Sequence, residues 1–354
     1  MAGWALAWQR RMTAMTRRMV KQAVKTQIKK AVKTVVKKAA KPAAPARAKS
    51  ASTSAGAGAG AGAGAWLPGV AVGATGARAY RLYRPPGLTA SERLPLLVML
   101  HGCGQSASDF AASTRMNQLA DRERCWVLYP EQDRLANAQG CWQWFESASG
   151  RADAEIALLM KAIDQVCLRH AINADQVAVA GLSAGASMAA LMALKHPTRF
   201  QAVVMHSGIA PGLAASRTTA LPAMQGRRRA HAWPLSALPP LLVVHGAADA
   251  VVAPSNGAVA ARLWADAVGA VARPPRAVQR GNRYPMTVTD YVQGRQVCVS
   301  QVEIARLGHA WSGGAAGQPF SDAKGPDASR LLWAFVARQF KAVRQRTDLP
   351  RQAA

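Results

Sequence analysis

Ser183 occupies a sequence setting that favours nucleophilic chemistry. It is the centre of Gly181-Leu182-Ser183-Ala184-Gly185, which follows the apolar run VAVA and precedes the amphipathic run ASMAALMALK. When a strand enters such a turn and a helix leaves it, the turn is strained and the serine Oγ is exposed, while the glycines allow close approach. A Gly/Ser/Ala-rich turn can match the pattern by chance, but the flanking strand and helix favour a nucleophile at Ser183.

A serine is a weak nucleophile and needs a base, which is oriented in turn by an acid. Asp249 follows the buried run 241–245 directly, so its carboxylate is expected at the carboxyl end of a strand. His309 lies in the glycine-flanked loop LGHAWSGG, which follows the strand-like run 302–307. The sequence therefore predicts Asp249 as the orienting acid and His309 as the base. Three other acids lie within periodic segments and fit less well: Asp266, Asp290 and Glu303.

An oxyanion that forms during acyl transfer needs two backbone donors. The residue after the nucleophile, Ala184, supplies the first N–H, and an early strand-to-helix loop supplies the second. The turn His101-Gly102-Cys103-Gly104 follows the buried run PLLVML and predicts Cys103 as the second donor.

Apolar runs alternate with helical patterns along most of the chain, which predicts an α/β fold with a mostly parallel central sheet flanked by helices. Helices are expected at 153–170 and 331–340, and a hairpin at 284–291 and 296–304. The segment 208–240 has weak periodicity and is interpreted as a surface insertion or lid. Other strands are expected at 79–83, 96–100, 126–129, 177–180, 202–205 and 241–245.

The basic character of the chain is concentrated at its beginning. The chain has 354 residues and a net charge of +27, and residues 1–49 carry 14 Lys and Arg and no acid. Four-residue spacing of valines and lysines within 17–41 favours a basic amphipathic helix, although a solvated charge run is equally consistent with it. We therefore divide the chain into a basic amphipathic or disordered arm at 1–49, an Ala/Gly/Ser linker at 50–65, a catalytic domain at 66–345 and a tail at 346–354.

The arm favours contact with an anionic or amphipathic surface, and nucleic acid is a second partner that its charge would suit. No secretion signal or membrane span is recognisable, so an intracellular location is favoured. The five cysteines show neither C-x-x-C spacing nor an adjacent His cluster, so a zinc site is not expected.

Five motifs in this order resemble the poly(3-hydroxybutyrate) depolymerase family of esterases, which includes feruloyl and acetylxylan esterases. The motifs, which lie within about 79–340, are HGCGQ, YPEQ, CWQWF, GLSAGA and GHAWSGG. The resemblance implies an α/β-hydrolase fold with Ser183, Asp249 and His309 as a triad and with neither a metal nor a cofactor. It also favours a polymer granule as the surface that the arm at 1–49 contacts, in an intracellular, granule-associated location. Family members that attack extracellular polymer typically add a linker and a C-terminal substrate-binding domain, and neither is recognisable here.

The expected activity is hydrolysis of short-chain 3-hydroxyacyl esters of polyester or small ester substrates by a serine carboxylesterase. A feruloyl or acetylxylan-type esterase is the alternative within the enzyme class, and a non-catalytic granule- or nucleic-acid-binding protein is the alternative outside it. Trp142, Trp144 and Trp311 lie in or beside the motifs and could line a substrate groove or belong to the core. Free thiols are the default for an unsecreted protein, but a disulfide between Cys103 and Cys141 is a hypothesis, since both lie in pocket motifs.

Overall fold

The computed structural model describes residues 64–89, 91–229, 233 and 237–348. The expected arm, nearly all of the expected linker and most of the expected tail lie outside these residues. The first described strand, β1, is Ala65–Gly73, and the last helix, α8, is Ala328–Asp348. Among the described residues, no helix combines the length and the apolar character that crossing a membrane requires.

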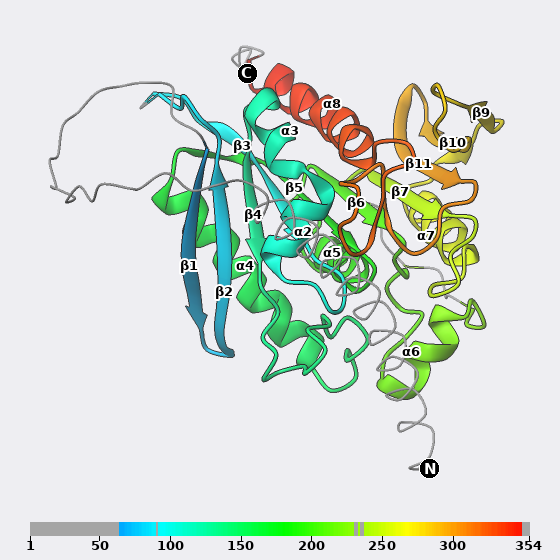
Figure 1. The fold of residues 1–354 in the computed structure, drawn as a ribbon, viewed down its shortest axis with the longest axis horizontal. Coiled ribbons are helices and arrows are strands. Elements are labelled where there is room, and N and C mark those ends of the chain that lie inside the picture. Colours follow the sequence, from blue (N-terminus) through cyan, green and yellow to red (C-terminus); the bar gives the residue numbers. More distant parts are fainter. Residues whose placement is uncertain (1–63, 90, 230–232, 234–236, 349–354) are drawn as a thin grey trace, which may run out of the picture.

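One large sheet organises the described part of the chain (Figure 1), and its strand order is β1-β2-β4-β3-β5-β6-β7-β11-β10-β8, with β9 paired to β10. The strands from β4 to β11 in this order pair in parallel. The remaining pairs, at the two edges of the sheet, are antiparallel. The predicted mostly parallel sheet is confirmed. Besides β1, its strands are β2 (Gly76–Arg84), β3 (Leu94–Leu100), β4 (Trp126–Pro130), β5 (Ile172–Leu182), β6 (Ala202–His206), β7 (Leu241–Gly246), β8 (Val271–Ala272), β9 (Arg276–Val278), β10 (Met286–Gln293) and β11 (Gln296–Ile304).

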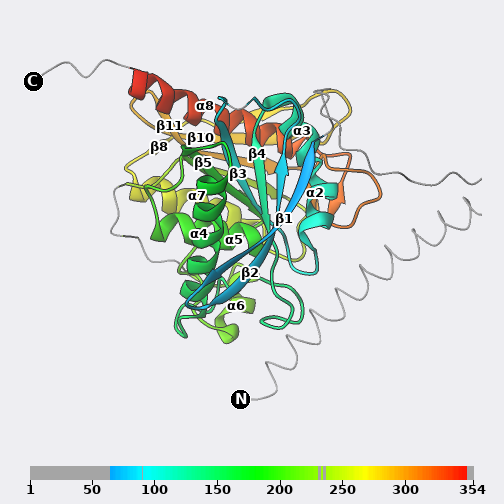
Figure 2. The same cartoon turned by 90° about the vertical axis from the view of Figure 1, so that its left-hand side faces the viewer.

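Helices cover both faces of this sheet (Figure 2), as a parallel sheet with continuous apolar strands requires. Every residue of β3, β4, β6 and β7 is buried. One face packs against α4 (Arg151–Arg169), α5 (Ala184–Lys195) and α7 (Ser255–Ala267). The other face packs against α2 (Ala107–Thr114), α3 (Met116–Glu123) and α8.

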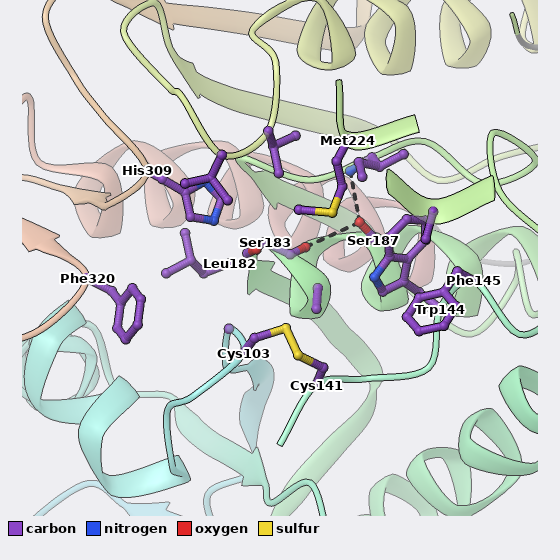
Figure 3. Close-up of a pocket in the computed structure, with 16 residues that line it drawn as sticks. Cys103, Cys141, Trp144, Phe145, Leu182, Ser183, Ser187, Met224, His309 and Phe320 are labelled. Carbon is purple, nitrogen blue, oxygen red and sulfur yellow. Dashed lines mark hydrogen bonds between the residues drawn. A yellow bond between two sulfur atoms is a disulfide. The ribbon is translucent and has the colours of Figure 1, made fainter. Parts of the chain in front are cut away.

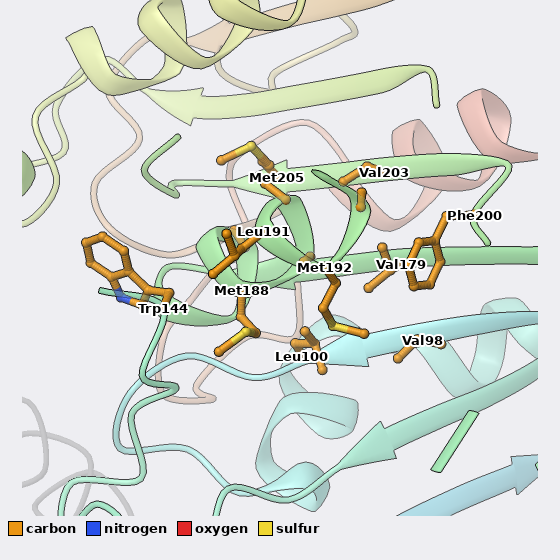
Figure 4. Close-up of a cluster of buried hydrophobic side chains, with 14 of the residues drawn as sticks. Val98, Leu100, Trp144, Val179, Met188, Leu191, Met192, Phe200, Val203 and Met205 are labelled. Atoms are coloured by element: carbon orange, nitrogen blue, oxygen red, sulfur yellow. The ribbon is translucent and has the colours of Figure 1, made fainter. Parts of the chain in front are cut away.

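Helix α5 is buried along most of its length, because it lies against the middle of the sheet (Figure 4). Met188 and Met192 are fully buried and belong to the same apolar cluster as Val98, Val179 and Val203 from three neighbouring strands. The unbranched methionine side chains suit the uneven space between a helix and a twisted sheet. This packing fixes the N-terminus of α5, and therefore the turn before it.

The sequence predicts a surface insertion or lid at 208–240, and the described part of this segment is not a mere surface insertion, since it contributes to the core and to the pocket described below. Its described part contains α6 (Arg217–Met224), and Ile209, Leu213 and Ala220 are buried in the same core as α5. Its alanine-rich composition hid this role, because small residues pack closely without producing a strong period. Two short strands that the sequence does not predict, β12 (Trp311–Ser312) and β13 (Ser321–Asp322), pair in parallel near the end of the chain.

Candidate active site

Ser183 occupies a strained turn between β5 and α5. Its φ of 57° and ψ of −120° lie outside the regions that non-glycine residues normally adopt. A Cβ on Gly181 would lie 2.3 Å from the carbonyl carbon of Gly185, so the turn is too tight for a side chain at that position. The predicted setting of Ser183, a strand followed by a strained turn and a helix, is therefore present in the structure.

His309 and Asp249 meet although they are far apart in the sequence. Nδ1 of His309 lies 2.7 Å from Oδ2 of Asp249. β7 and β11 are parallel neighbours, so the loops after them leave the same edge of the sheet. The N–H of Ala248 in the first loop donates to the carbonyl of Leu307 in the second, at 3.0 Å. This contact between the loops holds both side chains at the same edge.

Asp249 is a buried carboxylate with several donors around it. Its Oδ1 accepts from the N–H groups of Val251 and Val252, each at 2.9 Å. Nε2 of His245 lies 3.4 Å from Oδ2, on the same oxygen that contacts His309. Burial alone would raise the pKa of Asp249, but contacts from His245 and His309 and the backbone donor outweigh it and hold the pKa well below its usual value. Asp249 is therefore ionised, as an orienting acid must be.

Cys103 and Ala184 line the same pocket as Ser183 and His309. Ala184 is the first residue of α5, and the first N–H groups of a helix have no partner within it. In the described part of the chain, the N–H of Cys103 donates to no other group, whereas that of Gly104 donates to the carbonyl of Gln139 at 2.9 Å. Among the described residues, two backbone donors without a hydrogen-bond partner therefore border the pocket that Ser183 lines.

A disulfide joins Cys103 to Cys141, and their Cα atoms are 4.3 Å apart. The hypothesis of this bond is confirmed, and the default of free thiols at these two positions is wrong. Gln132 supports the same two loops, because its N–H donates to Nε2 of His101 at 3.1 Å and its side chain to the carbonyl of Cys141 at 2.9 Å. The buried side chain of Gln132 is itself held by two hydrogen bonds, one accepted from Arg78 and one donated to Glu155.

The pocket around Ser183 is mostly apolar (Figure 3). Its wall includes side chains from the loop that contains CWQWF, from α5 and α6, from the loop after Asp249 and from the loop after His309. No Asp, Glu, Lys or Arg from the described ranges lines it. Its lining residues are Gly102, Cys103, Cys141, Trp144, Phe145, Leu182, Ser183, Ala184, Ser187, Ile209, Ala220, Met224, Val251, Val252, His309 and Phe320.

Of the three tryptophans predicted to bind substrate, only Trp144 lines this pocket. Trp142 is fully buried, and its Nε1 donates to the carbonyl of His101 at 2.9 Å. Trp311 is also buried, stacks on His206 with ring centroids 5.0 Å apart, and donates to Oγ of Ser329 at 3.1 Å. The prediction for Trp142 and Trp311 is corrected: both belong to the core, because their indole N–H groups are engaged inside the protein.

Several lining residues were missed from the sequence. Ile209, Met224 and Phe320 are separated from every motif, and only the tertiary fold brings them to Ser183. Val251 and Val252 could have been inferred, since they follow Asp249 directly. Within the residues that the structure describes, no group of three or more His, Cys, Asp or Glu side chains is placed to hold a metal ion.

The fold and this site define an α/β hydrolase. A family model described as esterase PHB depolymerase matches residues 78–273, which is more than half of the chain. The chain therefore belongs to this esterase family, and the predicted family and fold are both confirmed.

Relatives within the family differ in their substrates. Poly(3-hydroxyalkanoate) depolymerase C of Paucimonas lemoignei is 32% identical over 185 residues, which cover 49% of this chain and 44% of that protein. Feruloyl esterase B of Thermothelomyces thermophilus is 25% identical over 194 residues, which cover 49% of this chain and 66% of that protein. The chain thus spans about half to two thirds of the length of these curated relatives.

A solved structure supports the fold independently. An acetyl xylan esterase from Aspergillus awamori superposes with a TM-score of 0.55 at 18% identity, covering 70% of this chain and 94% of that one.

Proposed function

We propose that this protein is a serine carboxylesterase that works through a Ser183-His309-Asp249 triad and an acyl-enzyme. The observation that supports this most directly is the 2.7 Å contact between His309 and Asp249, beside a pocket that Ser183 and His309 both line. A nucleophile, a base and an acid that orients the base are the parts that acyl transfer through serine requires.

In the first half of the reaction, Ser183 Oγ attacks the ester carbonyl carbon while Nε2 of His309 takes the hydroxyl proton. Asp249 accepts the Nδ1–H of His309, which fixes the tautomer and stabilises the imidazolium. The carbonyl oxygen becomes an anion and is held by the N–H groups of Cys103 and Ala184. The tetrahedral intermediate then breaks its bond to the alcohol oxygen, which leaves with the proton from His309.

In the second half, a water molecule attacks the acyl carbon and gives its proton to Nε2 of His309. The ester bond to Ser183 breaks, the acid is released, and the proton returns to the serine oxygen. Each half uses the same base and the same oxyanion donors.

For the substrate, we propose short-chain 3-hydroxyacyl esters of the polyhydroxybutyrate type. The depolymerase among the relatives and the apolar, uncharged wall of the pocket support this choice. The feruloyl esterase among the relatives supports a second candidate, an esterase for the acyl groups of plant polysaccharides. The two are separated by kcat/KM on 3-hydroxybutyrate oligomers, methyl ferulate and acetylated xylan. A higher value on either of the last two would favour the polysaccharide esterase.

The triad is tested by Ser183→Ala. We expect this substitution to lower kcat by roughly 10⁴- to 10⁶-fold with an unchanged fold, because triad members act as a unit. A serine-directed phosphonate should label Ser183 in the parent protein. Labelling of another serine, with activity retained in Ser183→Ala, would refute the assignment. A parent that hydrolyses no ester would instead favour the non-catalytic granule- or nucleic-acid-binding alternative.

The arm at 1–49 is proposed to contact the polymer granule, on the basis of its charge and its apolar spacing in the sequence. Removal of residues 1–63 should then abolish co-sedimentation with granules and leave the hydrolysis of soluble esters unchanged. Binding to nucleic acid would weaken by about 10³-fold or more between 50 and 200 mM salt, because it depends on counterion release. Granule binding through apolar contacts should survive that change, and a truncated enzyme that still co-sediments would exclude the arm as the tether.

A further inference from the structure

The pocket has two ends with different walls, and they lie on opposite sides of Ser183. In Figure 3, His309 and Phe320 lie on one side of Ser183, and Trp144 and Phe145 lie on the other. An ester has two parts that could occupy these ends, the acyl group and the alcohol group. The chemistry of the proposed reaction determines which end each part takes.

The alcohol must lie at the end that contains His309. In the proposed mechanism, on which this inference rests, His309 returns its proton to the alcohol oxygen as the bond breaks, so that oxygen must lie within reach of Nε2. The carbonyl oxygen must face the N–H groups of Cys103 and Ala184. The acyl chain must then extend toward the other end of the pocket, which contains Trp144 and Phe145.

The acyl end is a fixed apolar wall. The rings of Trp144 and Phe145 pack edge to face with centroids 5.3 Å apart, and both side chains are nearly buried. Ile209 also lines the pocket, and its N–H donates to Oγ of Ser187 at 2.8 Å, which ties its loop to α5. Such a wall suits a short aliphatic chain.

The alcohol end contains Phe320, which the proposed chemistry does not use. Its φ is 56°, in the left-handed region that a bulky side chain rarely adopts. Its carbonyl accepts from the N–H of Trp311 at 2.7 Å, and the pairing of β12 with β13 begins at this contact. The loop that begins at His309 therefore also fixes Phe320. A strained residue that the surroundings hold in place beside a reactive centre points to a functional role.

We propose that Phe320 selects the alcohol part of the ester, whereas Trp144 and Phe145 select the acyl part. The alcohol favoured at Phe320 is apolar, such as the alkyl hydroxy-acid unit that continues a polyester chain.

Two ester series test this assignment. In one, the acyl group is butyryl and the alcohol is methyl, butyl or benzyl; in the other, the alcohol is p-nitrophenol and the acyl group is acetyl, butyryl or hexanoyl. In Phe320→Ala we expect the preference for benzyl over methyl butyrate, as a ratio of kcat/KM, to fall by about 10-fold. The preference for hexanoyl over acetyl should change by less than about 2-fold. Trp144→Ala, the matched variant at the other end, should show the reverse pattern.

Phe320→Gly separates the side chain from the backbone, because glycine adopts a positive φ without strain. Equal loss of the alcohol preference in the alanine and glycine variants would support the proposal. An alcohol preference that does not move in either variant, or an acyl preference that moves as much, would overturn it. An inactive parent would refute the proposed function and this assignment together, whereas an active parent with unmoved ratios would refute the assignment alone.

Discussion

Gly185 lies so close to the end of β3 that a Cβ at this position would be 2.1 Å from the carbonyl oxygen of Leu100. This contact brings the N-terminus of α5 against the strand that leads to the Cys103 loop. The contact therefore ties the turn that contains the proposed nucleophile to the strand that precedes one of the two proposed oxyanion donors. The second glycine of the motif is therefore required by packing, since its own position is helical.

Gly185→Ala should therefore disrupt both the fold and the site. Overpacking typically costs about 1–3 kcal/mol, and the neighbours here are backbone atoms that cannot move aside. We expect a lower midpoint of urea unfolding and a large loss of kcat. Gly308→Ala is the stability control, because no atom lies within 4 Å of its added Cβ. A Gly185→Ala protein with parental stability would contradict the packing argument.

Asp249→Asn should lower kcat by about 10⁴-fold, as the corresponding change does in serine-protease triads, because an amide can hold the imidazole in the wrong tautomer. The binding of uncharged esters should change little, so KM is expected to stay near the parental value. Asp290→Asn is the matched control, because this acid lies on β10 and binds Oγ of Ser300 at 2.6 Å. Equal losses in the two variants would argue against a special role for Asp249.

Much of this site follows from the sequence, because its parts lie directly after buried strands. Ser183, Asp249 and His309 each follow an apolar run, and parallel strands bring the loops after them to one edge. Phe320 could not be predicted, since its position depends on a long loop that folds back on itself. The difference between Trp142 and Trp144 depends on how one irregular loop turns.

The strand β1 was also missed, although the expected domain begins near it. Its outward face contains Val70 and Val72, which are 51% and 66% exposed, so it lacks the alternation of apolar and polar residues that indicates a half-buried strand. The pairing with β2 defines β1 as a strand, and such pairing is not visible in a local pattern.

Acid should destabilise this protein through two buried histidines. Burial lowers the pKa of His101 to about 4 and that of His206 to about 3. An unfolded histidine has a pKa of about 6.5. Below that pH the unfolded state binds more protons than the folded state, so the free energy of unfolding decreases as the pH is lowered. For each histidine the fall should approach about 1.4 kcal/mol per pH unit near pH 5, and it levels off as the pH reaches the lowered pKa of the folded-state histidine.

Urea unfolding at pH 7, 6, 5 and 4 measures this slope. His196→Gln, at an exposed histidine, should leave it unchanged. His206→Gln should reduce it, because one titrating group is removed. Asp249 acts at lower pH: its pKa is depressed, so its stabilisation is present above about pH 4 and is lost as the pH falls further. A free energy of unfolding that is constant from pH 7 to pH 4 would show that neither histidine is protonated on unfolding.

The disulfide between Cys103 and Cys141 should contribute to both stability and turnover. It closes a loop with a sequence separation of 38, for which the chain-entropy relation gives about 4 kcal/mol. Replacing both cysteines by serine should lower the free energy of unfolding by an amount of this order. It should also lower kcat more than it raises KM, since the Cys103 N–H is proposed to bind the oxyanion, which forms only during the reaction.

Cys167→Ser, at a free and partly exposed thiol, is the control for a loss of sulfur alone. Mass spectrometry without reduction should find the 103–141 cross-link in protein made under oxidising conditions, which favour such bonds. A serine pair with parental kcat would show that the bond serves stability only, and would remove the disulfide from the support of the oxyanion loop.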